Sequence, residues 1–518
     1  MSYTAVVARA VAMLLVVSAP VVEAQKPAPG GTAARFGGAN DADAAGVTAL
    51  HRAVESDDAT AVEQLLRGGA DVNATTRYRV TPLSIAALHG NAAIASMLLK
   101  AGANPHAVMG AGEPVIMTAA RTGNVALLTA LIEAGADVNA RERFYGQTPL
   151  MWAAIEDHGA AIAALAAAGA DVNARANILE GEPTWRYGAD SRNGINGEAL
   201  QNFNTNFSKG GLTSLMYAAR EGSTAAVQAL VDAGASHRTA DPEGFTPLLL
   251  AIQNGHYDTA AALVGKGADV NQADRSGQTP LFAVTDFRSM LWIYNRPKPR
   301  PRTTLDSLGL AKVLLDKGAK VDVKLTGPAR RPMGGGGSGL TGRGATAFLR
   351  AAVASDLPMM RLLLERGADP KVATANGVTA LQAASGLRWS DNSMSWAVTG
   401  GLATEEMSLT AVQMLLDLGL EVNAADDQGA TALHGAAARG ANDIIKLLVS
   451  KGARLDVKTK PRMRQQTVDN EPPLNIPPRT PLDEAIESDP PRPATVALLR
   501  ELMGEDPNAP IRDPSRRR

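Results

Sequence analysis

The sequence predicts an all-α solenoid with short β-hairpin fingers, and two repeated signals predict it. A Thr-Pro-Leu-like start recurs eleven times, and a Gly-Ala turn follows ten of these starts. Where nothing is inserted, one start lies 33 or 34 residues from the next. A fixed period of this length is typical of proteins whose repeats pack only against their neighbours. Because a solenoid presents a long surface, the pattern favours binding over chemistry.

The start of each repeat predicts a short first helix. Its Thr precedes an apolar run, so the hydroxyl can cap the helix, and Pro suits the next position because its missing N–H costs nothing there. An Ala-rich segment follows, as in LSIAAL at 83–88. The starts lie at 48–51, 81–84, 114–117, 148–151, 213–216, 246–249, 279–282, 346–349, 379–382, 431–434 and 480–483.

A second helix with paired aliphatic residues, as in IIKLLV at 444–449, is expected to fill the core between repeats. The Gly of the Gly-Ala turn ends this helix in a left-handed conformation that other residues adopt at a cost. The polar stretch after the turn predicts a hairpin or turn, here called a finger, which leads to the next Thr. The turns occupy 68–74, 101–107, 134–140, 168–174, 233–239, 266–272, 317–323, 366–372, 418–424 and 451–457.

This combination of start, turn and period resembles the ankyrin repeat family from about Gly46 to Met503. The resemblance implies an ankyrin repeat stack of about eleven repeats with loop insertions, with helix pairs in two layers and hairpin fingers at the foot. It also implies that fingers and first helices line a concave groove that binds other macromolecules. The family has no shared catalytic residues, so the resemblance implies a binding module and not an enzyme.

The amino-terminal segment predicts export. Arg9 precedes an apolar stretch from Ala10 to Val22, and small residues at Val22 and Ala24 suit cleavage after Ala24. The stretch is shorter than the roughly 20 residues that span a membrane, so we expect a signal peptide at 1–24 and no integral membrane segment after cleavage. A disordered apolar tail is the alternative. Residues 25–45, rich in Ala, Gly and Pro, predict a flexible linker, and 504–518 a disordered tail.

Composition narrows the class further. The formal net charge of −1 argues against a nucleic-acid-binding protein, and the absence of Cys excludes disulfides. Asn73 and Asn206 match the glycosylation pattern, but a glycan on a packed finger Asn73 would disturb the stack. This favours a bacterial, periplasmic setting over a eukaryotic secretory one. We expect an exported protein, periplasmic or secreted, and a monomer.

Five inserts interrupt the repeat, at about 175–210, 287–303, 324–343, 386–408 and 459–478. By their position relative to the Gly-Ala turn, the first, third and fifth extend fingers, and the other two separate the helices of one pair. Trp185 and Tyr187 lie in the first insert. Such aromatic residues can serve as binding anchors, or they can fold back and seal the loop onto the stack. The basic run 296–302 is either a solvated segment or a contact for an acidic partner.

The finger tips carry the candidate partner-binding residues. Arg and Tyr are preferred at interfaces because both give a large contact area with directed hydrogen bonds. The hypothesis is a docking patch centred on 77–79 and 141–145; the alternative is ordinary surface charge. Further along, the tips become acidic at Asp241, Asp274 and Asp426, where an Asp before a Gly is also an ordinary turn former. The candidates are Arg77, Tyr78, Arg79, Arg141, Arg143, Phe144, Tyr145 and Arg175, with Trp185 and Tyr187 of the first insert.

The sequence offers little for catalysis or metal binding. No two His residues have metal-ligand spacing, and no Cys can assist them. No nucleophile-elbow, P-loop or zinc-protease motif occurs, so we expect no catalytic residue, no metal and no cofactor. The expected function is a protein-interaction scaffold for an exported partner protein of unknown identity. Two alternatives stay open: an accessory chaperone of an exported enzyme, and a secreted effector directed at a host or another cell.

Overall fold

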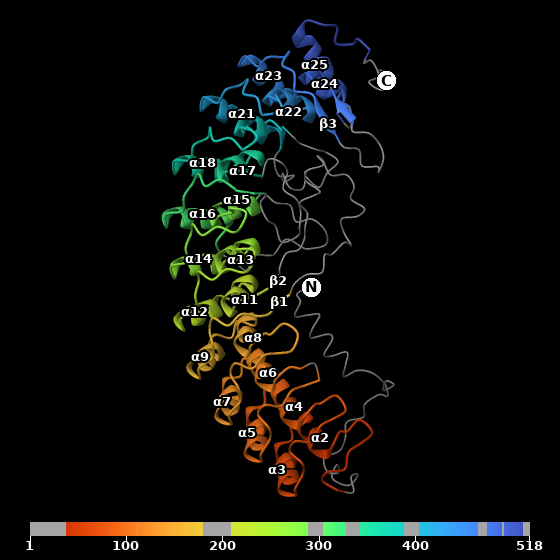
Figure 1. The fold of residues 1–518 in the computed structure, drawn as a ribbon, viewed down its shortest axis with the longest axis vertical. Helices are drawn as coiled ribbons and strands as arrows, with labels where there is room; N and C mark the ends of the chain where they lie inside the picture. The colour runs from red at the N-terminus through yellow and green to blue at the C-terminus, as the bar shows by residue number, and fades with distance from the viewer. Residues whose placement is uncertain are drawn as a thin grey trace.

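The computed structural model describes residues 38–110, 112–179, 209–288, 304–327, 342–387, 404–464, 474–488 and 492–510. In this part of the chain lie 22 helices, in eleven successive pairs, and two short two-stranded sheets. Figure 1 shows the pairs stacked one on the next along a curved axis. The all-α solenoid predicted from the repeat is therefore confirmed.

The first helix of each pair begins at the predicted start. The Thr81 hydroxyl accepts a hydrogen bond from the backbone N–H of Ser84 (3.1 Å), and Pro82 occupies the first turn of its helix. The Thr thus supplies one of the acceptors that the free N–H groups of a helix start require. The first helices are α2 (Ala49–Glu55), α4 (Pro82–Leu88), α6 (Val115–Thr122), α8 (Pro149–Ile155), α11 (Ser214–Glu221), α13 (Pro247–Gln253), α15 (Pro280–Arg288), α17 (Ala347–Val353), α19 (Ala380–Ala384), α22 (Ala432–Arg439) and α24 (Pro481–Ile486).

The second helices form the outer column on the left of Figure 1. Their aliphatic residues, such as Leu98 and Leu131, are fully buried. The Gly-Ala turn that follows contains a left-handed Gly, as at Gly135 (φ 89°). These helices are α3 (Ala59–Arg67), α5 (Ala92–Lys100), α7 (Val125–Glu133), α9 (Gly159–Ala167), α12 (Thr224–Asp232), α14 (Tyr257–Gly265), α16 (Ser307–Asp316), α18 (Leu357–Glu365), α21 (Glu405–Asp417), α23 (Asn442–Ser450) and α25 (Pro493–Met503).

Small side chains let the first helices approach one another. Ala119 and Ala120 of α6 and Ala153 and Ala154 of α8 are all inaccessible to solvent, and α6 packs against both α4 and α8. The second helices pack in the same order, α5 on α7 and α7 on α9. The result is one hydrophobic core that runs the length of the stack from Leu50 to Leu499.

The fingers connect one pair to the next. Described in chain order, they occupy 40–47, 74–80, 107–110 with 112–114, 140–147, 174–179 with 209–212, 240–245, 273–278, 324–327 with 342–345, 373–378, 424–430, and 457–464 with 474–479. Backbone hydrogen bonds join several neighbours, such as Arg77 N–H to the carbonyl of Ala45 (3.0 Å) and Lys460 N–H to that of Gln428 (2.7 Å).

An Asn at the base of a finger bridges to the following Gly-Ala turn. Asn73 donates to the carbonyl of Gly102 (3.0 Å) and accepts from the N–H of Asn104 (2.8 Å). Asn40 makes the same two contacts, with Gly69 and Asp71. The ordered stack therefore begins before residue 46, inside the range that the sequence assigned to a flexible linker.

The inserts leave and rejoin the stack at defined places. Strands β1 (Ile178–Leu179) and β2 (Lys209–Gly210) pair antiparallel at the fifth finger, and β3 (Arg462–Arg464) pairs with β4 (Leu474–Ile476) at the eleventh. The residues between these strands lie outside the described ranges. Two helices extend into ranges that the sequence assigned to inserts: α15 runs to Arg288, and α21 begins at Glu405, because Thr404 caps it.

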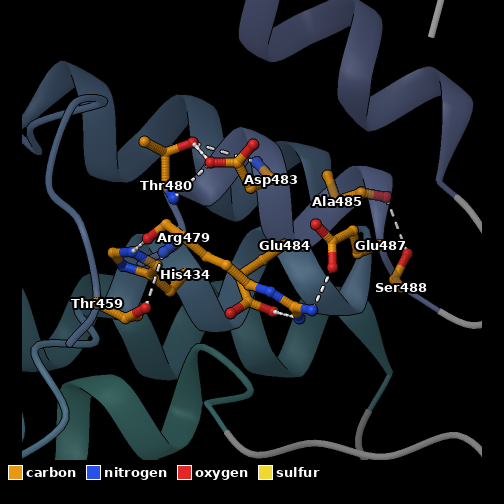
Figure 2. Close-up of polar contacts among 9 residues, drawn as sticks. All are labelled: His434, Thr459, Arg479, Thr480, Asp483, Glu484, Ala485, Glu487 and Ser488. Carbon is orange, nitrogen blue, oxygen red and sulfur yellow. Dashed lines mark hydrogen bonds and ion pairs between the residues drawn. The ribbon is translucent and has the colours of Figure 1, made fainter. Parts of the chain in front are cut away.

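The carboxyl-terminal end is fastened by Arg479 (Figure 2). Its backbone N–H donates to the Thr459 hydroxyl (2.9 Å), and its carbonyl accepts from the N–H of Thr459 (2.9 Å) and from Nε2 of His434 (3.1 Å). Its guanidinium pairs with Glu484 (3.6 Å) and Glu487 of the last repeat. One residue therefore ties the eleventh finger to both α22 and the α24 segment.

Candidate protein-binding surface

The second finger presents two cationic side chains and one aromatic ring. The hydroxyl of Tyr78 accepts a hydrogen bond from Nη2 of Arg77 (2.7 Å), and the guanidinium of Arg77 lies 4.7 Å from the centre of the Tyr78 ring. The backbone N–H of Arg79 donates to the carbonyl of Thr76 (2.9 Å), and this hydrogen bond closes the turn. All three side chains are exposed. Arg77 thus holds the Tyr78 ring in place at the surface.

The fourth finger is shaped by a buried carboxylate. Glu142 accepts backbone N–H groups from Phe144 (2.6 Å), Tyr145 (2.6 Å) and Gln147 (3.1 Å). These bonds fold the turn around the carboxylate, and the side chains of Arg143, Phe144 and Tyr145 are left exposed. The sequence places an acid at this tip, but the structure turns it inward and the aromatic rings outward.

Exposed apolar side chains gather on the second to fifth fingers. Among the described residues, eight large apolar side chains are exposed, and five of them lie here: Tyr78 (48 %), Val108 (44 %), Phe144 (61 %), Tyr145 (42 %) and Ile178 (51 %). Val108 and Ile178 were missed by the sequence reasoning, which looked for Arg and aromatic residues only. Val108 lies on the third finger, between the two predicted tips, and Ile178 lies on the fifth, next to the second tip. An apolar residue at a finger tip is therefore the sequence signal that could have identified them.

We define the N-terminal finger surface as Arg77, Tyr78, Arg79, Val108, Arg143, Phe144, Tyr145 and Ile178. The third finger links its two halves: a Cβ on Gly110 would lie 2.7 Å from the carbonyl oxygen of Tyr78, and one on Gly112 would lie 3.1 Å from the Cβ of Arg143. The second, third and fourth fingers are therefore in direct contact. Aromatic and Arg side chains exposed on a preformed frame are the composition typical of interface hot spots.

The structure gives two predicted residues another role. Arg141 donates to the carbonyl of Gly146 in its own finger (3.0 Å) and to that of Arg175 in the next (2.7 Å). Arg175 in turn donates to the carbonyl of Ala240 in the sixth finger. Both guanidinium groups brace neighbouring fingers, so we do not include them in the surface. Trp185 and Tyr187 lie outside the described residues.

The fingers further along carry the acidic residues that the sequence places at their tips, and most of these carboxylates face their own turns. Asp274 and Asp426 are buried, and each carboxylate accepts two N–H groups of its own turn: Ser276 and Gln278 for Asp274, Gln428 and Ala430 for Asp426. Burial raises the pKa of Asp274 above its ordinary value. These residues are turn formers, as the alternative interpretation held, and only Asp427 of the tenth finger is exposed.

The face of the first helices changes along the stack. In α6 and α8, Arg121 lies over the Trp152 ring (5.8 Å to its centre), and both side chains are only partly buried. The equivalent positions in α15 and α17 hold Asp286 and Arg350, an ion pair whose side chains are fully buried. A burial of this kind demands a partner for each charge. The same two positions are therefore partly accessible in α6 and α8 and closed in α15 and α17.

The described residues contain no group of three or more His, Cys, Asp or Glu side chains placed to hold a metal ion. No helix among them is long and apolar enough to cross a membrane.

The helix pairs, the Thr-capped starts and the braced fingers define a repeat protein of the helical solenoid class. The family model of ankyrin repeats matches residues 33–109, 106–176, 192–284 and 401–510. The chain belongs to the ankyrin repeat family.

Solved structures with similar folds include two ankyrin repeat domains. That of Bcl-3, described as a unique member of the IkappaB protein family, is 25 % identical, with a TM-score of 0.37, and the match covers 46 % of this chain and 94 % of that one. That of human ASB11 is 21 % identical, with a TM-score of 0.38, and the match covers 53 % and 99 %. No curated protein matches the chain in sequence.

Proposed function

We propose that the chain is a protein-interaction scaffold that binds an exported partner protein through the N-terminal finger surface. Ankyrin repeats generally mediate protein–protein interaction. The observation that carries the proposal is the clustering of five exposed large apolar side chains on four neighbouring fingers, flanked by Arg77, Arg79 and Arg143. Exposed apolar side chains that gather beside polar groups are characteristic of an interaction site.

Site-specific photo-crosslinking tests this proposal. A photoreactive phenylalanine analogue is placed at Tyr78, Val108 or Phe144 of the mature protein, and in matched controls at Val125 or Leu418, which are exposed apolar residues away from the fingers. Crosslinking is carried out in the native compartment. We expect one and the same protein to be captured from the three finger positions and from neither control. Capture from the controls alone, or from no position, would contradict the proposal.

Alanine variants then measure the contribution of the surface. With the captured protein purified, Tyr78→Ala and Phe144→Ala should each weaken binding by about tenfold or more, as expected for aromatic hot-spot residues, whereas Leu418→Ala should leave it unchanged. Arg141 and Arg175 are left intact, because their replacement would disturb the fingers as well as the surface. Equal affinity in all variants would place the binding site elsewhere on the stack.

We propose in addition that the protein acts outside the cytoplasm. The apolar stretch from Ala10 to Val22 and the small residues at Val22 and Ala24 support this. The amide of Asn73 is engaged with Gly102 and Asn104, so a glycan there would remove a bridge between repeats. That favours a bacterial periplasm. Sequencing the amino terminus of the cellular protein should find Gln25, and an intact Met1 terminus would contradict export.

Fractionation separates the remaining interpretations. Retention in the periplasm fits a scaffold or an accessory chaperone of an exported enzyme, and accumulation in the medium fits a secreted effector.

A further inference from the structure

Arg79 occupies a backbone position that is glycine in the other fingers with a comparable turn. The position lies two residues before the capping residue of the first helix, which is Thr81 in this repeat. Nine described fingers have a left-handed Gly there: Gly46, Gly112, Gly146, Gly211, Gly244, Gly277, Gly344, Gly377 and Gly429. Arg79 adopts the same left-handed conformation (φ 59°) with a full side chain.

This substitution works against the local backbone. The left-handed region is open to Gly and strained for a residue with a Cβ. The fold itself does not call for an Arg here, because Gly performs the same turn in the neighbouring fingers. Backbone strain that the fold does not require is characteristic of functional sites. We therefore expect the side chain of Arg79 to have a function that a Gly at this position could not supply.

The neighbouring finger accommodates Arg79. In the first finger, the left-handed Gly46 faces the backbone of the second finger. A Cβ on Gly46 would lie 3.0 Å from the Cα of Thr76, so a larger residue would not fit there. Between the second and third fingers, the close approach falls instead on Gly110, beside the carbonyl of Tyr78. The contact between fingers is thus kept while Arg79 remains exposed.

The exposed charges of the second, third and fourth fingers all have one sign. Arg77 and Arg143 are exposed on the same surface. The two acidic residues of the second to fourth fingers face inward: Glu142 is buried in its turn, and Glu113 accepts from the hydroxyl of Thr118 (2.6 Å). The exposed surface of these fingers is therefore cationic and apolar together, although the whole chain has a formal net charge of −1.

We propose that Arg79 is the residue that selects the partner, by binding a carboxylate in an acidic segment of the partner protein whose apolar side chains pack on Tyr78 and Phe144. A guanidinium binds a carboxylate through two parallel hydrogen bonds, so it provides geometric selection that a Lys does not match. The proposal rests on the proposed function, since it names the partner chemistry of the same surface.

The test uses two labelled peptides, one alternating Glu with Leu and Phe, and one with each Glu replaced by Gln. Both are titrated against the full mature protein and against Arg79→Gly, Arg79→Lys and Arg361→Ala, the last being an exposed Arg on α18. The Glu peptide should bind the wild type about tenfold more tightly than the Gln peptide. Arg79→Gly should remove that preference, Arg79→Lys should keep part of it, and Arg361→Ala should leave it unchanged.

Thermal unfolding of the same variants separates recognition from folding. Because Gly suits the left-handed turn, Arg79→Gly should not lower the unfolding midpoint. Lost peptide binding with an unchanged or raised midpoint supports the proposal. A lowered midpoint, or a preference for Glu that survives in Arg79→Gly, overturns it.

The result is distinguishable from failure of the proposed function. If both peptides bind equally and Phe144→Ala weakens both, the surface binds proteins but does not select carboxylates. If neither peptide binds and position 144 crosslinks to no protein, both proposals fail.

Discussion

At the scale of single residues, one position shows how different side chains perform the same task. The third residue after the capping Thr is His51 in α2, Gln382 in α19 and His434 in α22. His51 Nε2 donates to the carbonyl of Val80 (3.0 Å), and Gln382 donates to that of Ala430 (2.7 Å), each in the following finger. His434 Nε2 makes the same bond with the carbonyl of Arg479 (3.1 Å), so all three side chains join neighbouring repeats. The two imidazoles differ from the amide in one respect, which is that they titrate.

Stability should therefore fall in mild acid. Burial lowers the pKa of His51 and of His434 below the ordinary value of 6.5. Below about pH 6.5 the unfolded chain binds protons that the buried imidazoles of the folded chain do not bind, so the free energy of unfolding should decrease as the pH falls below about 6.5. Because Gln382 already makes the equivalent bonds, His51→Gln with His434→Gln should reduce this pH dependence.

Urea unfolding at several pH values measures the effect. The exposed His106→Gln serves as the control and should leave the slope of stability against pH as in the wild type. An unchanged slope in the double variant would show that other groups govern the pH dependence.

At the scale of elements, an Asn bridge joins several of the fingers to the next helix pair. Asn423 donates to the carbonyl of Gly452 (2.9 Å) and accepts from the N–H of Arg454 (2.9 Å), as Asn73 and Asn271 do in their repeats. The bridge binds one repeat to its neighbour without contributing to the hydrophobic core. It should therefore act on the coupling between repeats.

Asn423→Ala should weaken that coupling. Losing both bonds should cost about 1–3 kcal/mol, because backbone groups of the neighbouring turn lose their partner. Asn104→Ala is the matched control, since its side chain accepts only from His106 within its own turn. Hydrogen exchange should show faster opening of α23 and α25 in Asn423→Ala alone. Equal effects of the two substitutions would contradict a coupling role.

At the scale of the whole molecule, stability is distributed along the stack. Each pair packs mainly against its neighbours, so the ends need a cap, and the last repeat with its Arg479 contacts provides one. The N-terminal finger surface lies at the opposite end of the chain from this cap. Loss of the cap should consequently leave the surface intact.

Deletion of residues 459–518 tests this separation. It removes the eleventh finger from residue 459 onward and the helices α24 and α25, and so uncovers the side of α22 that packs against α24. Hydrogen exchange should lose protection in 404–457, whereas 40–179 should exchange as in the full chain. Deletion of 511–518 alone is the control. A uniform loss of protection along the chain would contradict the nearest-neighbour account.

How far the sequence predicts this structure differs between fold and surface. The fold follows from residues that recur, such as the capping Thr81 and the left-handed Gly135, because each copy repeats the same local rule. The surface depends on where side chains turn. Glu142 faces inward and Arg141 reaches the next finger, and only three-dimensional distances show this. Arg79 is different: aligning the fingers reveals the missing Gly, so the sequence alone contained that signal.

The contact between successive fingers also sets a length. Neighbouring helices pack about 8–10 Å apart, so the three intervals from the second finger to the fifth span about 24–30 Å. An extended chain advances about 3.3 Å per residue, so a partner strand lying along these tips would need about 7–9 residues to reach from Tyr78 to Ile178. The spacing of the fingers thus sets a minimum length for a bound segment. Shortening the segment below that length should weaken binding stepwise, with one step for each finger that the segment no longer reaches.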